Sequence, residues 1–228
     1  MLAHSSVPVF GVLRVFTEER RARRGWPCMA TVSRAPRLMR RRSNVQKAVR
    51  TLIRAAGDDP DREGLVETPA RVERALAEWF SGYSVDPAQL LEARFDAGLP
   101  GGGEVFVPGI AVHSHCEHHF APITGTACVA YEPLGKVCGL SKIARLVDAY
   151  ARRLQLQERL TNQIASTMWC ELEPTGVAVI IRATHACMTS RGAKQSNSSM
   201  LTTSFYGSYA DPARQRDFIA RSGLGYAG

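Results

Sequence analysis

Apolar residues recur at helical spacing in several stretches of the chain. Between residues 44 and 56 they recur every three or four positions, which favours an amphipathic helix that ends at Gly57. A second helix is predicted from Thr68, which could cap it, with Pro69 at its first position and an end near Gly82. The same spacing predicts helices after residue 140, over 155–172 and over 212–221, and a short one within 86–97.

Other stretches alternate apolar and polar residues with a period of two, which is typical of strands. They span residues 104–114, 122–132, 177–188 and 200–207, and residues 137–142 read as a strand that runs into a helix. Within 177–188 the alternation places His185 and Cys187 next to each other on the face that is apolar further back. The mixed pattern predicts one α+β domain over 44–228, with N-terminal helices over 44–97, a loop at 99–103 and an α+β body over 104–222.

Residues 1–43 differ in composition from the rest. They hold ten of the 29 basic and two of the 21 acidic residues, which leaves 19 of each sign beyond residue 43. The net charge of +8 therefore belongs to this segment, which we interpret as a disordered basic tail, a targeting peptide or an extension ahead of a start at Met29. Because the body is neutral, we expect no nucleic acid partner. No apolar run has the ~20 residues of a membrane span and no secretory signal is evident, so we expect a cytoplasmic protein.

Cysteine and histidine cluster in residues 113–120, HSHCEHHF. Cys116 and His119 are three apart, one helical turn, so both side chains can reach one point as two ligands of a tetrahedral zinc. His118 lies between them, points elsewhere, and is free to act as an acid or base. Cys187 is the candidate third ligand, which would leave the fourth position to a water whose pKa zinc lowers from ~15.7 to about 7. His113 and His115 are competing donors.

Cations gather at the start of the helix that follows residue 140. Ser141 at the helix start, with Lys142 and Arg145 in the first turn, suits an anion because free backbone N–H groups and two positive charges point the same way. An ordinary N-cap with two solvated charges explains the pattern equally well. Arg71, in the first turn of the helix from Thr68, reads on its own as a solvated charge.

Several motifs occur together and in order: SHCEHHFAPITGTACVAYEP, GLSKIARLVDAYARR, QLQERLTNQI and THACMTSRG. Over residues 44–222 they resemble the GTP cyclohydrolase I family. The resemblance implies that the chain opens the imidazole ring of GTP, releases formate and rearranges the rest to 7,8-dihydroneopterin triphosphate, the first step of pterin, folate or deazapurine biosynthesis. It also implies the tunnelling fold, an antiparallel sheet with helices on one face. Such chains assemble into a multi-subunit β-barrel, usually a homodecamer, with active sites between subunits.

The resemblance assigns roles position by position. It implies that zinc is held by Cys116, His119 and Cys187, with His118 and His185 as the acid–base pair. It further implies that the guanine base is recognised by Gln157 and Glu158, and that the catalytic Ser141 also contacts the substrate. The implied ribose and triphosphate contacts are Ser141, Lys142, Arg145, Arg191 and, from a neighbouring subunit, Arg71.

Some positions depart from the family pattern. His115 stands where the family usually has threonine, and Leu154 replaces a usual proline. These substitutions favour an outlying member, without removing a catalytic residue. Two alternatives stay open: another tunnelling-fold enzyme acting on a purine or pterin, such as the deazaguanine nitrile reductase, or a non-catalytic structural-zinc protein that binds RNA through its basic tail.

Overall fold

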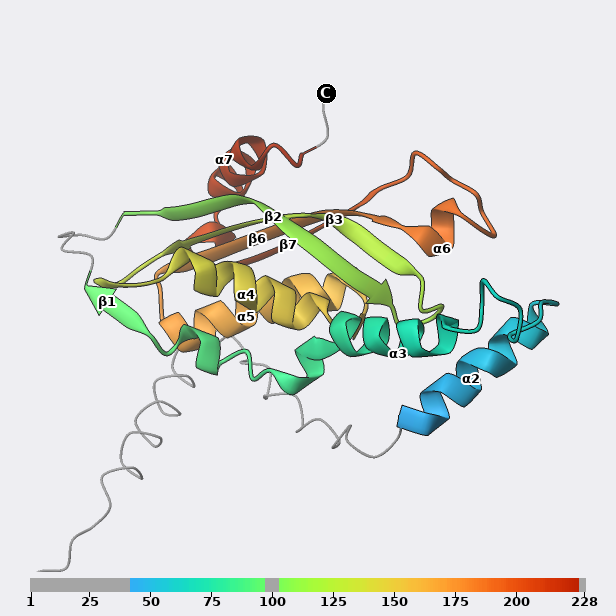
Figure 1. The fold of residues 1–228 in the computed structure, drawn as a ribbon. Coiled ribbons are helices and arrows are strands. Elements are labelled where there is room, and N and C mark those ends of the chain that lie inside the picture. Colours follow the sequence, from blue (N-terminus) through green and yellow to red (C-terminus); the bar gives the residue numbers. More distant parts are fainter. Residues whose placement is uncertain (1–41, 97–102, 226–228) are drawn as a thin grey trace, which may run out of the picture.

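The computed structural model describes residues 42–96 and 103–225. Within these residues, one sheet has the strand order β5-β2-β3-β6-β7 (Figure 1). Its long strands are β2 (Val105–Cys116), β3 (Pro122–Glu132), β6 (Gly176–His185) and β7 (Met200–Gly207), and each pairs antiparallel with the next. The short β5 (Leu154–Gln155) adds to β2 in parallel. The predicted strands at 122–132 and 200–207 are confirmed with the same bounds.

Helices cover both faces of the sheet. Helices α4 (Leu140–Ala151) and α5 (Gln157–Leu172) pack on one face, where the odd residues of β3 and β6 join the main apolar core. Helix α7 (Pro212–Ser222) lies on the opposite face, and its Phe218 packs against Cys128, Ala130, Ala178 and Ile180 (Figure 1). The expectation of an α+β fold is confirmed, whereas the expectation of helices on one face is wrong, because both faces of the central strands are apolar and need cover.

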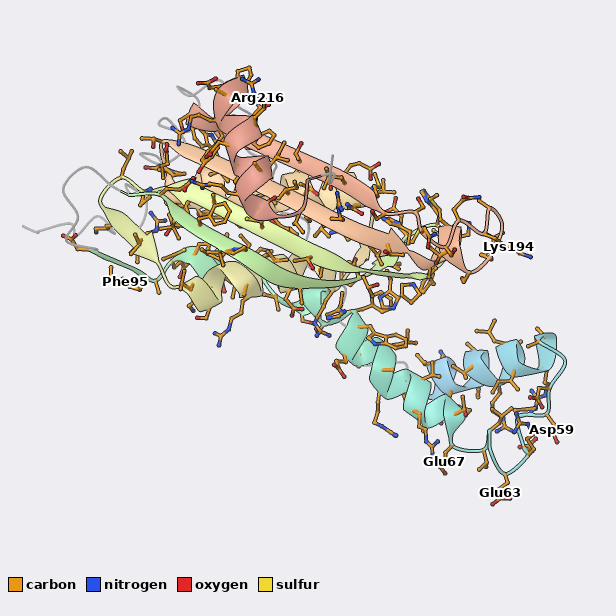
Figure 2. The ribbon with its side chains drawn as sticks, turned by 90° about the horizontal axis from the view of Figure 1, so that it is seen from above. Asp59, Glu63, Glu67, Phe95, Lys194 and Arg216 are labelled. Atoms are coloured by element: carbon orange, nitrogen blue, oxygen red, sulfur yellow. The ribbon has the colours of Figure 1, made fainter. Side chains whose placement is uncertain are left out.

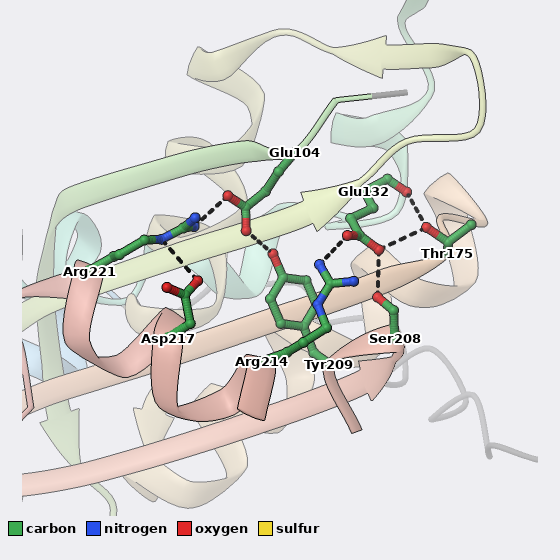
Figure 3. Close-up of polar contacts among 8 residues, drawn as sticks. All are labelled: Glu104, Glu132, Thr175, Ser208, Tyr209, Arg214, Asp217 and Arg221. Carbon is green, nitrogen blue, oxygen red and sulfur yellow. Dashed lines mark hydrogen bonds and ion pairs between the residues drawn. The ribbon is translucent and has the colours of Figure 1, made fainter. Parts of the chain in front are cut away.

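Polar contacts fasten α7 and the short η4 (Ser208–Ala210) to the ends of β2 and β3 (Figure 3). Two carboxylates, Glu104 and Glu132, accept the hydrogen bonds. Burial would raise the pKa of Glu132, but hydrogen bonds from its neighbours outweigh this and lower the pKa, so the carboxylate stays charged. The donors are Tyr209 and Arg221 to Glu104, and Arg214, Ser208 and Thr175 to Glu132.

The N-terminal helices form a hairpin of α2 (Arg42–Ala55) and α3 (Thr68–Trp79). Figure 2 shows it extending past the end of the sheet where the loop with Lys194 lies. The two helices fall where the spacing predicts them, but Glu67 and not Thr68 is the N-cap residue. After α3 the chain continues through η2 (Ser81–Ser84).

The predicted helix within 86–97 is wrong. The chain there forms η3 (Gln89–Leu91) and the strand β1 (Arg94–Asp96), which pairs with β4 (Lys136–Cys138). This pairing is a long-range contact that local spacing does not report. Most of the predicted loop at 99–103, and residues 1–41 of the predicted tail at 1–43, lie outside the described residues, whereas α2 begins at Arg42.

Two element ends near the site also differ from the predictions. Strand β6 ends at His185, and Cys187 lies in the short helix α6 (Ala186–Thr189), so the two side chains do not share a strand face. Helix α5 begins at Gln157 rather than 155, because Leu154 and Gln155 pair with the end of β2. No helix among the described residues is long and apolar enough to cross a membrane.

Candidate active site

A tight turn follows β2 and carries the clustered histidines. Cys116, the last residue of β2, is 5% exposed. Its N–H donates to the Ala121 carbonyl at 2.8 Å, and its carbonyl accepts from the Phe120 N–H at 2.9 Å. Phe120 closes the turn with a left-handed φ of 56°. Although the segment is not helical, the turn brings His119 Nδ1 to 3.9 Å from Cys116 Sγ, so the three-residue spacing still produces a pair of donors.

Cys187 completes a three-donor group with Cys116 and His119. The ligand atoms of the three residues all lie within 4.8 Å of one another. Two sulfurs and one imidazole nitrogen are donors that zinc prefers, and three protein donors leave a fourth position open. Burial raises the pKa of the Cys187 thiol, and the adjacent Cys116 adds to the rise, because two thiolates repel each other. A cation would hold both as thiolates, so this donor set fits a metal.

The competing donors lie outside this group. His113 and His115 alternate with Cys116 along β2 and therefore lie on the other face of the strand. The His115 ring packs against Trp79 and Phe80 at the end of α3, with ring centroids 5.1 and 5.2 Å away. The geometry thus favours Cys187 over either histidine as the third donor.

His118 stays close to the donor group. Its Nδ1 lies 3.9 Å from Cys116 Sγ, as far as that of His119, and the two exposed rings meet edge to face. The expectation that His118 points elsewhere is therefore wrong. A tight turn, unlike a helix, does not separate neighbouring side chains by a fixed angle.

His185 is held by the side chain of Gln157, which is 1% exposed. Gln157 Nε2 lies 3.0 Å from both the Ile181 and the Met200 carbonyl, which can only accept, so its amide oxygen must face His185 Nε2 at 2.8 Å. His185 Nε2 consequently carries the proton, and Nδ1 is the acceptor of the neutral ring. Burial lowers the pKa of His185, with Glu158 opposing that effect.

These groups line one cavity of about 470 Å³. It brings together seven predicted site residues from β2 and its turn, the start of α5, and the β6–α6 corner. These are Cys116, His118, His119, Gln157, Glu158, His185 and Cys187. The cavity is also lined by residues that the sequence did not single out, because they carry no distinctive chemistry or spacing: Gln155, Leu156, Met188, Ser198, Ser199, Met200 and Leu201.

The predicted anion contacts are not gathered there. None of Ser141, Lys142 and Arg145 lines the cavity. Helix α4 is about 18 Å long and its last residue, Ala151, precedes β5 closely in the chain, so its first turn is at the end of the helix away from β5. Ser141 and Lys142 are in that first turn, which Gly139 and not Ser141 caps, and Arg145 lies in the second turn. The helix starts directly after β4, which pairs with β1, and Figure 2 shows Phe95 of β1 at the end of the molecule opposite Lys194.

The two remaining arginines lie apart from the cavity lining. Arg71 is exposed in the first turn of α3, whereas Trp79 at the other end of that helix contacts His115 near the end of β2. Arg191 follows α6 and is close enough to Cys187 for its positive charge to oppose part of the rise in the pKa of that thiol. One chain thus presents the donor group and the histidines but only part of the predicted cationic contacts.

Arg159, a residue that the sequence patterns did not single out, lies in the first turn of α5. Its guanidinium donates two hydrogen bonds to the Glu117 carboxylate, at 2.6 and 3.1 Å, and lowers the pKa of Glu117. The sequence places Glu117 beside the metal ligands but gives no signal for its partner 42 residues later.

The model of the family described as GTP cyclohydrolase I matches residues 45–222. "GTP cyclohydrolase 1" of Brucella canis is 50% identical over 175 residues, 77% of this chain and 82% of the relative. "GTP cyclohydrolase 1" of Maricaulis maris is 46% identical over 195 residues, 86% of this chain and 95% of the relative. The archaeosine synthase QueF-Like structure in the apo form is 17% identical, covering 48% of this chain and 96% of that chain, with a TM-score of 0.38.

Proposed function

The chain belongs to the GTP cyclohydrolase I family and is a GTP cyclohydrolase, and from this premise we propose a zinc-dependent reaction in the cytoplasm. GTP and water give formate and 7,8-dihydroneopterin triphosphate, at the head of pterin and folate biosynthesis. One observation carries the proposal: three metal-type donors lie in the same cavity as two histidines and an exposed carboxylate.

The three-donor group and the two histidines have different roles in the proposed reaction. Cys116, His119 and Cys187 would hold a zinc ion, which when bound supplies a Lewis acid that activates water for attack at C8. His118, beside the donor group, and His185, at the end of β6, handle protons at the leaving nitrogen and the ribose ring oxygen. The neutral tautomer that Gln157 imposes leaves His185 Nδ1 as the atom that takes up a proton.

Glu158 recognises the guanine base. Its carboxylate is exposed at the cavity and can accept hydrogen bonds from both N1–H and the 2-amino group, which adenine cannot offer together. The predicted role of Gln157 in base recognition stays a prediction. Because its amide donors are engaged by strand carbonyls, we propose that Gln157 supports recognition mainly by holding His185.

The direct test is to incubate the purified, zinc-loaded chain with GTP. We expect release of one formate per GTP and a product that fluoresces as a pterin after oxidation. ATP should give neither signal, because it lacks the N1–H and 2-amino pair. GTP recovered intact under these conditions would disprove the proposed reaction.

The triphosphate is proposed to be held partly by a second copy of the chain. Its several negative charges need local cations, and Ser141, Lys142 and Arg145 do not line the cavity of their own chain. Arg71 is likewise exposed away from the cavity. A homo-oligomer, by the family resemblance a decamer, would bring these residues to the cavity of a neighbouring copy, joined there by Arg191 of the chain that supplies Cys187.

Mixed assembly tests the shared site. Arg145→Ala and Cys187→Ser chains should each be nearly inactive alone. Reassembled in equal amounts they should recover about a quarter of the wild-type activity, because random pairing leaves that share of interfaces with both residues intact. The control is a mixture of Cys187→Ser with Cys116→Ser, which restores no site since both residues come from one chain. A mixture of the first pair that stays inactive would show that the site is not shared.

A further inference from the structure

The metal turn, residues 116–120, contacts β5 and the start of α5 through Glu117. Its carboxylate receives both arms of the Arg159 guanidinium, at 2.6 and 3.1 Å, and its backbone N–H donates to the Gln155 carbonyl at 3.1 Å. Gln155 also faces Cys116 in the parallel pairing of β5 and β2. The turn is therefore held on β5 by a backbone bond and on the first turn of α5 by a two-armed ion pair.

The two histidines that follow Glu117 are exposed. Within the described part of the chain, each ring lies 3.9 Å from Cys116 Sγ, and the two rings contact each other edge to face. The position of the His119 nitrogen relative to the two sulfurs thus depends on how the turn is held. The first turn of α5, which holds it, also carries Gln157 and Glu158.

We propose that Glu117 and Arg159 form a positioning pair that presets the metal turn, and so sets how tightly the three-donor group binds zinc. The inference rests on the proposed zinc-dependent function and assigns a role to two residues outside the donor group. Neither residue belongs to the donor group or lines the cavity; the pair acts through the placement of His119.

The geometry distinguishes this pair from an ordinary surface ion pair. Arg159 and Glu117 side chains are 40% and 29% exposed, so the attraction alone contributes little to global stability. A planar guanidinium held at two oxygens fixes both distance and orientation, however, and a lysine cannot reproduce this. Loss of groups that orient metal ligands typically lowers metal affinity by about 10–100-fold.

Zinc affinity of the full-length chain, measured by competition with a chromogenic chelator, tests the pair. Glu117→Gln and Arg159→Met should each raise the zinc dissociation constant by about 10–100-fold. Arg159→Lys should restore part of the loss, and the double variant should be no weaker than either single one, because both changes remove one interaction. Melting temperature and oligomer size, measured alongside, should match the wild type.

Arg62→Met is the matched control. Arg62 makes an equally two-armed pair with Asp58, at 2.9 and 2.8 Å, in the loop after α2, so its loss should leave zinc affinity unchanged. If the wild type binds zinc tightly and both pair variants bind as tightly as the control, the positioning role is wrong while the proposed function stands. If the wild type itself binds no zinc, both are wrong. If the two changes raise the zinc dissociation constant multiplicatively in the double variant, they do not act through one shared interaction, and the proposed positioning pair is wrong.

Discussion

Replacing Cys187 with serine is expected to release the metal and lower GTP turnover by more than about 100-fold, since even loss of a group that only supports a ligand costs 10–100-fold in affinity or activity. Cys187 supplies one of three donors within 4.8 Å of one another. A serine hydroxyl is not ionised at neutral pH, whereas zinc takes cysteine as thiolate. Zinc content per chain and the rate of formate release measure both effects on the same sample.

Cys138→Ser is the control for this change. Cys138 is 3% exposed and its sulfur accepts a hydrogen bond from the Tyr131 hydroxyl, a contact that a serine oxygen can also accept. It lies at the end of β4, beside the start of α4 and away from the donor group. We therefore expect its zinc content and turnover to stay near wild type. Full zinc content in Cys187→Ser would show that another residue supplies the third donor.

Replacing His185 with glutamine is expected to lower the rate of GTP ring opening by about 10²–10⁴-fold, the usual contribution of a positioned acid–base group. Glutamine can still donate an N–H to the Gln157 amide oxygen, which His185 contacts at 2.8 Å. It cannot take up a proton at neutral pH, so the variant separates proton transfer from placement. Single-turnover measurement of formate release reports the effect.

Zinc content distinguishes the effect of His185→Gln from the effect of losing a metal ligand. His185→Gln should retain the wild-type zinc, because His185 is not among the three grouped donors. Thr184→Ala is the control, since Thr184 is exposed and points to the other face of β6. A His185→Gln variant with wild-type turnover would remove His185 from the proton-transfer steps.

Local patterns predicted most of the elements. The strands at 122–132 and 200–207 have the observed bounds because the residue types that favour a strand are a local property of the sequence, even in β3, where residues 127–131 are buried on both faces. The prediction at 86–97 is wrong because β1 exists through its pairing with β4, 42 positions later. The turn at His185 ends a strand whose alternation continues to Cys187, so periodicity alone could not find it.

The sequence by itself determined the donor types and their spacing in the turn, the family, and the reaction class. These depend on side-chain chemistry and on residues that stay close along the chain. The sequence proposed Cys187 as the third donor but left His113 and His115 as competing donors, and the tertiary structure places Cys187 with Cys116 and His119. Only the tertiary structure decided that Gln157 turns its oxygen to His185 and that Arg159 holds Glu117. It also separated the α4 cations from the cavity. The physical reason is that these contacts join segments tens of residues apart, and their distances are set by strand pairing and helix packing.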